Sequence, residues 1–364
     1  MKSKKFKLLG LMMALVMALA AFTGCGAGNK NQSSADADAT PAPSEAASET
    51  ASETASAVPE GMLSIGITQI VDHPSLDICR EGAIAKLAAL GYVEGKNLKI
   101  NYQSAQGEMA NATSIAQQFV ADNVDLIIAI ATPSAQAAYA SALDKGIPVV
   151  FAAVSEPAAA GLANADGTNI ANVTGASDKL PVSATFDLIK QLTPDAVKIG
   201  ILHNTAEVNS DVQLAEAQAL AGEYGMQIVE KGITSTNEIA SALDAILPEV
   251  DVIMNLTDNM IVSSLALEVQ KCNEASIPLY GSEDTQVSNG ALASAGVDYK
   301  ALGEITGEMV AKILGGAAAQ TLPIETLKSP KLIVNSDRLA ALGLSVPDAI
   351  KDSVELVSTA ADNA

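Results

Sequence analysis

The stretch Val124–Tyr139, VDLIIAIATPSAQAAY, decides the fold expected for this chain. Its apolar run Leu126–Ile130 does not alternate with polar residues, which is typical of a strand covered on both faces in a parallel α/β sheet. A helix is expected to begin at Pro133, since proline has no amide hydrogen to lose in a first helical turn. The unpaired amides of Ser134, Ala135 and Gln136 would then point at the carboxyl end of the strand. We therefore expect an anion-binding site there, built from backbone.

The same construction returns at Val250–Ala266, VDVIMNLTDNMIVSSLA. Val124-Asp125 matches Val250-Asp251 at an offset of 126 residues, and Ile65-Gly66-Ile67 matches Ile199-Gly200-Ile201 at an offset of 134. A duplicated βαβ unit predicts an α/β protein with two Rossmann-like lobes. Strand ends and helix N-termini of each lobe could then face the other lobe across a cleft.

Length and charge narrow the class of protein. A chain of 364 residues with 49% hydrophobic content suggests about two domains with sizeable cores. The net charge of −21 repels phosphate backbones, which argues against a nucleic-acid partner.

The N-terminal segment is expected to be a signal peptide over residues 1–24. It has a basic start, MKSKKFK, and an apolar run, Leu8–Phe22, that is too short for an ordinary membrane span. The following Phe-Thr-Gly-Cys resembles the lipobox of bacterial lipoproteins, which implies that Cys25 becomes an acylated N-terminus. A lipid anchor on the extracytoplasmic face of the cell membrane is therefore expected. A secretory signal that happens to contain a cysteine is the alternative.

Residues 25–60 are expected to form a disordered acidic linker, because Gly26–Ala57 contains no Val, Ile, Leu, Met or aromatic residue. The first lobe is assigned residues 61–175 with 298–325, and the second residues 176–297 with 326–364. The crossings between lobes are expected within Asn172–Asp178 and at Gly296–Asp298. A helix after His73 should bury one face, formed by Leu76, Cys79, Ala83, Leu87 and Leu90. In the second lobe we expect a strand Val197–His203, a polar loop Asn204–Ser210, a helix Asp211–Gly222 and a strand Pro278–Gly281.

Short polar residues follow the expected strands of both lobes. Helix N-termini there would favour a carboxylate, and acidic side chains would favour an ammonium group, so the set suits a zwitterion. Each residue could instead be a helix N-cap. The candidates are Gln69, His73, Thr132, Ser134, Ser155, Glu156, Asn209, Ser210, Asp258, Asn259, Glu283 and Asp284, with Asp178 as a further carboxylate.

Catalysis, metal and nucleotide cofactors are not indicated. His73 and His203 are the only histidines, and neither has a second His or Cys at ligand spacing. The chain lacks a G-x-S-x-G elbow, a G-x-G-x-x-G turn and a P-loop. Cys79 and Cys272 are expected to be reduced and buried on helices of different lobes. A surface enzyme remains the less favoured alternative.

Seven segments together resemble the solute-binding lipoproteins of ABC importers, in the group that includes tryptophan- and other aromatic amino-acid-binding members. They are GITQIVDHPSLD at Gly66, GYVEGKNLKINYQSAQG at Gly91, AIATPSAQAA at Ala129, FAAVSEP at Phe151, NVTGASD at Asn172, LTDNMIVSS at Leu256 and AGVDYKALG at Ala295. The resemblance implies a type I periplasmic-binding fold with a three-segment hinge, and a membrane permease as partner.

The resemblance also implies roles for individual residues. Thr132, Ser134 and the Ala135 amide would hold the carboxylate of an amino acid. Gln69, Ser155 and Asp178 would line the cleft, and Asn209, Asp258 and Glu283 would reach it from the second lobe. A sugar or nucleoside receptor on the same fold is the alternative, although this set of cleft residues contains no arginine for binding hydroxyl groups.

Overall fold

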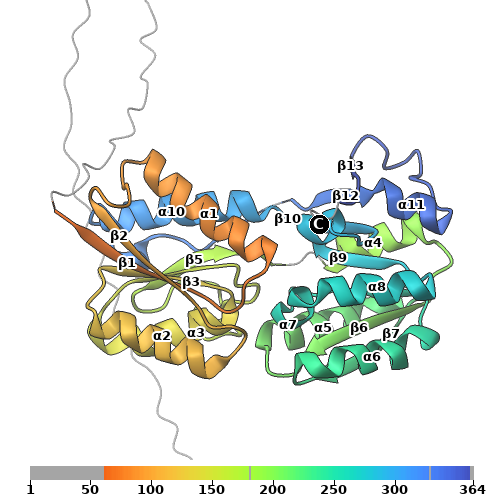
Figure 1. The fold of residues 1–364 in the computed structure, drawn as a ribbon, viewed down its shortest axis with the longest axis horizontal. Helices are drawn as coiled ribbons and strands as arrows, with labels where there is room; N and C mark the ends of the chain where they lie inside the picture. The colour runs from red at the N-terminus through yellow and green to blue at the C-terminus, as the bar shows by residue number, and fades with distance from the viewer. Residues whose placement is uncertain (1–60, 180–181, 328, 361–364) are drawn as a thin grey trace, which may run out of the picture. The chain divides into compact units, whose positions relative to one another are not determined.

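The computed structural model describes residues 61–179, 182–327 and 329–360, and the statements below concern those residues. These described residues belong to one compact unit, which contains two sheets (Figure 1). The first sheet has the strand order β11-β5-β4-β3-β1-β2, and all its neighbouring strands are parallel. Its strands are β1 (Leu63–Gln69), β2 (Leu98–Ser104), β3 (Leu126–Ile130), β4 (Val149–Ala152), β5 (Val173–Ser177) and β11 (Glu325–Thr326).

Helices cover both faces of this first sheet. α1 (Pro74–Ala89) packs against α10 (Tyr299–Leu314) on one face, and α2 (Met109–Ala121) packs against α3 (Thr132–Ala142) on the other (Figure 1). Every residue of β3 is buried, as its continuous apolar run predicts for a strand covered on both sides.

The second sheet has the order β13-β12-β10-β9-β8-β6-β7. Its neighbours are parallel except for the β10–β12 pair. Its strands are β6 (Lys198–Asn204), β7 (Gln227–Ile233), β8 (Val252–Met254), β9 (Leu279–Glu283), β10 (Ala293–Val297), β12 (Lys331–Asn335) and β13 (Glu355–Val357).

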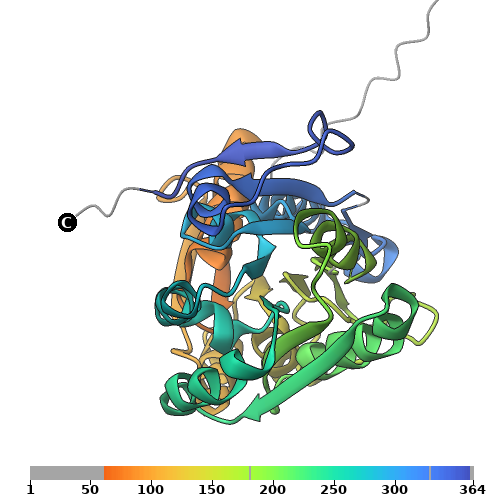
Figure 2. The same cartoon turned by 90° about the vertical axis from the view of Figure 1, so that its right-hand side faces the viewer.

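In this second lobe α4 packs with α5 and α6 packs with α8 (Figure 2). Its helices are α4 (Val182–Leu192), α5 (Val208–Ala221), α6 (Ile239–Ile246), α7 (Asn259–Ser263), α8 (Leu265–Ala275), α9 (Asp284–Ser288) and α11 (Ser336–Leu342). The core order β2-β1-β3-β4-β5 of the first sheet recurs as β7-β6-β8-β9-β10, so the predicted α/β fold of two similar lobes is confirmed.

The repeated aspartates make the same contact in both lobes. Asp125 Oδ2 accepts a hydrogen bond of 2.7 Å from the Ser64 amide at the start of β1. Asp251 Oδ2 accepts from the Val197 and Lys198 amides at 2.8 and 2.7 Å, at the start of β6. Each aspartate therefore joins the first and third strands of its lobe, which gives the sequence repeat a physical reason.

Replacing Asp251 with alanine is expected to lower the free energy of unfolding by about 1 kcal/mol, because two backbone amides lose a charged acceptor at an exposed site. Those amides hold the pKa of Asp251 below its ordinary value, so its stabilising contribution is present above that value and is lost as the pH falls. Urea unfolding measures the loss. Asp352→Ala, at an exposed position near the end of the chain, is the control and should match the wild type.

The chain passes between the sheets in three places: after β5, after β10, and between β11 and β12. The first two differ from the sequence prediction. NVTGASD is not a crossing loop, because it contains β5 and extends the first sheet to Ser177. Gly296 likewise lies inside β10. Both strands are short and rich in small residues, and a Cβ on Gly175 would lie 2.2 Å from the Phe151 carbonyl oxygen. The limits at 175 and 325 therefore move to 177 and 326.

Other element ends also differ from the predictions. α5 begins at Val208 rather than Asp211, so Asn209 and Ser210 lie in a helical first turn and not in a loop. β9 extends to Glu283, and α4 was not predicted. Leu90 is 43% exposed because α1 ends at Ala89, although the other four residues of its predicted face are buried.

Cys79 and Cys272 are free and buried, on α1 and α8. No helix within the described ranges is long and apolar enough to cross a membrane. The predicted signal peptide, Cys25 and the 25–60 linker lie outside the described residues.

Candidate ligand-binding site

A small cavity lies where the carboxyl ends of strands from the two lobes meet. Its volume is about 10 Å³, room for roughly one water molecule. From the first lobe and its crossings it is lined by His73, Leu76, Ala153, Asp178 and Tyr299, and from the second by Asn209, Thr257, Asp258, Asn259, Val262, Ser282 and Glu283.

The cavity is acidic. Three carboxyl groups line it, on Asp178, Asp258 and Glu283, and none of its lining residues is a lysine or arginine. Burial raises the pKa of Glu283 to about 7, and it also raises the pKa of Asp178 and of Asp258. Burial lowers the pKa of His73 to about 4, so this side chain is neutral at pH 7 and supplies no countercharge. The site thus favours a ligand group that carries positive charge.

Asp178 is held by residues from three segments. Tyr299, in the first turn of α10, donates its hydroxyl to Asp178 Oδ2 at 2.5 Å. Ser155, which follows β4, donates to Oδ1 at 2.9 Å. The Ser155 hydroxyl also lies 2.6 Å from that of Thr257 in the second lobe. Two crossings and both lobes therefore fix this carboxylate at the edge of the cavity.

In the second lobe Asp258 caps α7. It accepts hydrogen bonds from the Ile261 amide at 3.1 Å, the Asn204 amide at 2.6 Å and the Ser210 hydroxyl at 2.7 Å. Asp258 therefore caps a helix and also forms part of the cavity wall. Ser210 acts only through Asp258, because it does not line the cavity.

Glu207 supports this wall and was not predicted from the sequence. Its carboxylate accepts from the side chains of Asn204, Asn209 and Asn259 and from the Asn259 and Met260 amides. Burial, with the nearby Asp258 charge, raises the pKa of Glu207 to about 7. Asn209 also donates to the Thr257 carbonyl at 2.9 Å, while its Oδ1 has no partner within the described residues. Asn209 therefore presents a buried acceptor at the cavity.

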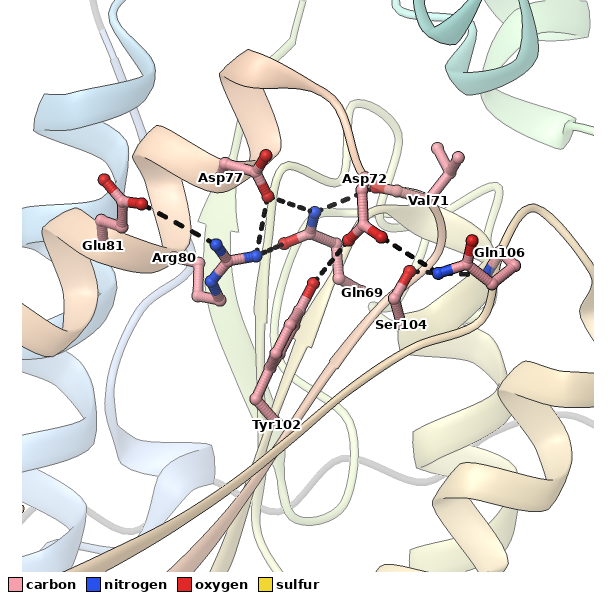
Figure 3. A network of polar contacts seen from close by, with 9 residues as sticks. All are labelled: Gln69, Val71, Asp72, Asp77, Arg80, Glu81, Tyr102, Ser104 and Gln106. Atoms are coloured by element: carbon pink, nitrogen blue, oxygen red, sulfur yellow. Dashed lines mark hydrogen bonds and ion pairs between the residues drawn. The ribbon is translucent and has the colours of Figure 1, made fainter.

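Gln69 lies elsewhere, in a polar network of the first lobe (Figure 3). Its Nε2 donates to the Val71 carbonyl and to Asp77 Oδ1, at 2.9 and 3.0 Å, and its Oε1 accepts from Arg80 at 3.0 Å. Arg80 also stacks 4.3 Å from the centre of the Tyr102 ring. Gln69 does not line the cavity, and its neighbours use both ends of its amide.

The start of α3, where the sequence predicts an anion-binding site, differs from that prediction in its helix boundary and in its free amides. The helix begins at Thr132, one residue earlier than predicted, and Ala131 is its N-cap with a φ of 75°. The Ala135 amide is consequently not free, since it donates to the Ala131 carbonyl at 3.0 Å. Thr132 and Ser134 are buried, and the Ser134 hydroxyl has no partner among the described residues. None of the three lines the cavity.

The structure thus brings six predicted residues together around one cavity: His73, Asp178, Asn209, Asp258, Asn259 and Glu283. It places Gln69, Thr132, Ser134, Ala135, Ser155, Glu156 and Ser210 outside the lining, with Glu156 paired to Lys179 at 3.2 Å. Tyr299 was missed because it begins a helix after a crossing, although the quoted AGVDYKALG segment contains it.

The buried carboxyl groups predict an unusual pH dependence of stability. Burial gives Glu207, Glu268 and Glu283 pKa values of about 7, above their ordinary 4.5. The folded protein therefore binds more protons than the unfolded chain between those values, so their contribution is full below 4.5 and is lost as the pH rises through 7. His73, with its lowered pKa, acts in the opposite direction between 6.5 and 4.

Between pH 8 and pH 6 the three glutamates gain protons, whereas His73 acts only below about pH 6.5. The melting temperature of the unliganded protein should therefore rise by roughly 5 °C from pH 8 to pH 6. Glu268 is buried but does not line the cavity. Glu268→Gln removes the free-energy cost of ionising this buried carboxyl group, so it should raise stability at pH 8 by about 1–3 kcal/mol and reduce the pH effect. Thermal unfolding at both pH values measures this. A melting temperature that falls towards pH 6 would contradict the assignment.

Three relatives are informative. A tyrosine-binding protein of Clostridioides difficile (strain R20291) is 43% identical over 281 residues, which are 77% of this chain and 81% of that protein. The structure of an ABC domain from Streptococcus pneumoniae in complex with L-Trp is 33% identical, with a TM-score of 0.78, over 82% of this chain and all of that one. A ligand-free, open substrate-binding protein with adhesive properties from Clostridium difficile is 40% identical, with a TM-score of 0.63, over the same shares.

The conformation described here is therefore closer to the L-Trp complex than to the open protein, although the open protein is more similar in sequence. A more distant structure from Thermotoga lettingae, in complex with 5-methylthioribose, is 20% identical and shares the fold alone, at a TM-score of 0.55 over 80% of this chain and 96% of that one. The family model described as ABC transporter substrate binding protein matches residues 64–357. The two lobes, the hinge and this match lead to one conclusion: the chain belongs to the ABC transporter substrate-binding protein family.

Proposed function

We propose that this protein captures an aromatic amino acid between its lobes on the extracytoplasmic face of the membrane and delivers it to an ABC permease. The observation that carries the proposal is the cavity wall, to which the crossing after β5 and the second lobe contribute buried carboxyl groups and in which no lysine or arginine takes part. A ligand ammonium group is the countercharge that such a wall accepts, because buried carboxylates are costly unless they are paired.

The carboxylate and the side chain of an amino acid also need binding groups in this protein. The buried Ser134 hydroxyl at the start of α3 is a free polar group for the ligand carboxylate, together with the helix N-terminus. An aromatic amino acid is larger than a cavity of about 10 Å³, so the lobes must separate at the hinge to admit it. The tyrosine-binding relative and the L-Trp complex support an aromatic side chain.

Calorimetry with a panel of ligands tests the proposal. Tyrosine, tryptophan and phenylalanine should bind, leucine should bind less tightly, and a ribose sugar and a nucleoside should give no heat. Because this chain contains no tryptophan, fluorescence excited near 295 nm reports bound L-tryptophan without a protein tryptophan background. Binding of the sugar or nucleoside with silence from every amino acid would replace the proposal with the sugar-receptor alternative. Chemical conversion of a bound ligand would indicate an enzyme.

The anchor requires a separate experiment. If Cys25 is acylated, radiolabelled palmitate should be incorporated into the wild-type protein and not into Cys25→Ser. The variant should also leave the membrane fraction on cell fractionation. Equal membrane retention of both proteins would overturn the lipid anchor and leave the ligand proposal intact.

A further inference from the structure

One hydrogen-bonded group of side chains joins the lobes beside the cavity. The Ser75 hydroxyl, in the first turn of α1, donates to Glu283 Oε1 at the end of β9. The Ser75 hydroxyl also contacts the Thr285 hydroxyl in α9, and either of these two hydroxyls can be the donor. Thr285 Oγ1 lies 3.3 Å from the same Glu283 oxygen. Ser75 belongs to the first lobe and Glu283, 208 residues later in the chain, ends a strand of the second sheet, so this contact exists only where the two lobes lie together.

The position of Ser75 separates this contact from ligand binding. Ser75 is fully buried, yet neither Ser75 nor Thr285 lines the cavity. Of the three, only Glu283 does. A buried hydroxyl without a partner is costly, and hydrogen bonds to ionised groups are stronger than those between neutral groups. The pairing of Ser75 with Glu283 therefore stabilises the arrangement in which the lobes are together.

We propose that Ser75 and Thr285 form a closure latch: they hold Glu283 across the lobe interface, stabilise the closed form, and so set how long a bound ligand is retained. They are positioning residues, because they act through Glu283 and do not touch the ligand. The inference rests on the proposed function only for the choice of ligand used to observe it.

The first test is a rate measurement with L-tryptophan, followed by its fluorescence in a stopped-flow instrument. Ser75→Ala should release L-tryptophan about tenfold faster than the wild type, with the association rate unchanged within about twofold. Thr285→Val keeps the shape of the side chain and should show the same effect in smaller degree. Ser114→Ala removes a hydroxyl that bonds only within α2, to the Ala110 carbonyl, and should match the wild type.

Two results would overturn the latch: a dissociation rate equal to that of the wild type in both variants, or a loss of affinity that lies wholly in the association rate. Small-angle X-ray scattering of the unliganded proteins keeps the latch testable if no amino acid binds and the proposed function fails. The latch predicts a larger radius of gyration for Ser75→Ala than for the wild type and Ser114→Ala. Equal radii in that case would refute it.

Discussion

Asp178→Asn is expected to weaken amino-acid binding by about 100-fold, which corresponds to a loss of about 2.7 kcal/mol. Asp178 is buried at the cavity edge, and Tyr299 and Ser155 both donate hydrogen bonds to it. These donors orient the carboxylate, while its charge is left to pair with a ligand cation. Asparagine has nearly the same shape but no charge, and its amide nitrogen cannot accept from either donor. Calorimetry with tyrosine measures the change.

The control for this variant is Asp144→Asn, an identical substitution at an exposed position between α3 and β4. It should leave the affinity unchanged. Circular dichroism and thermal unfolding establish that Asp178→Asn is folded, so that a weaker affinity reflects the lost charge. Wild-type affinity in a folded Asp178→Asn protein would remove Asp178 from the binding site and would leave Glu283 and Asp258 as the partners for a cation.

Gly303→Ala is expected to have the largest effect on stability, a loss of about 3 kcal/mol and a decrease of roughly 6–12 °C in melting temperature. In α10 a Cβ at this position would lie 2.1 Å from the Cys79 carbonyl oxygen and 3.1 Å from the Ala83 amide nitrogen, both in the backbone of α1. The two helices therefore approach so closely that no side chain fits between them. Since α10 enters the first lobe from the second crossing, a displaced α10 would also move Tyr299 away from Asp178.

A matched glycine distinguishes this steric effect from helix propensity. Gly222 ends α5 with a φ of −62°, and a Cβ there would meet no atom within 4 Å. Gly222→Ala should be neutral or slightly stabilising, by up to about 1 kcal/mol, because alanine is the better helix former. Urea unfolding of both variants measures the two changes. Equal stabilities of Gly303→Ala and Gly222→Ala would show that α1 and α10 can separate at no cost.

Several features of the fold were predictable because they depend on local patterns. The run Leu126–Ile130 is apolar throughout, which specifies a central strand whatever its neighbours are. The repeated Val-Asp pairs mark the same contact in each lobe. β5 and β10 were taken for crossings because their small residues give no periodic signal. They are strands because the neighbouring strands pair with them.

The site was predictable only in part, for a reason that Gln69 and Asp258 illustrate. Both follow or end strands at the edge of a sheet, and both carry polar side chains. Arg80 and Asp77 bind the amide of Gln69 within the first lobe, whereas Asp258 caps α7 and still reaches the cavity. A sequence shows which polar groups reach a sheet edge, but it does not show which neighbours satisfy them first.

The sequence by itself determined two similar α/β lobes, since burial of apolar strands and repetition of landmarks are properties of short segments. It also placed the acidic candidates Asp258 and Glu283 after strands. Only the tertiary structure decided that Asp178, Asp258 and Glu283 surround one cavity, and that Ser75 meets Glu283 from the opposite lobe. Contacts between residues as distant as these depend on how three crossings orient two separate cores, and no local pattern in the chain encodes that orientation.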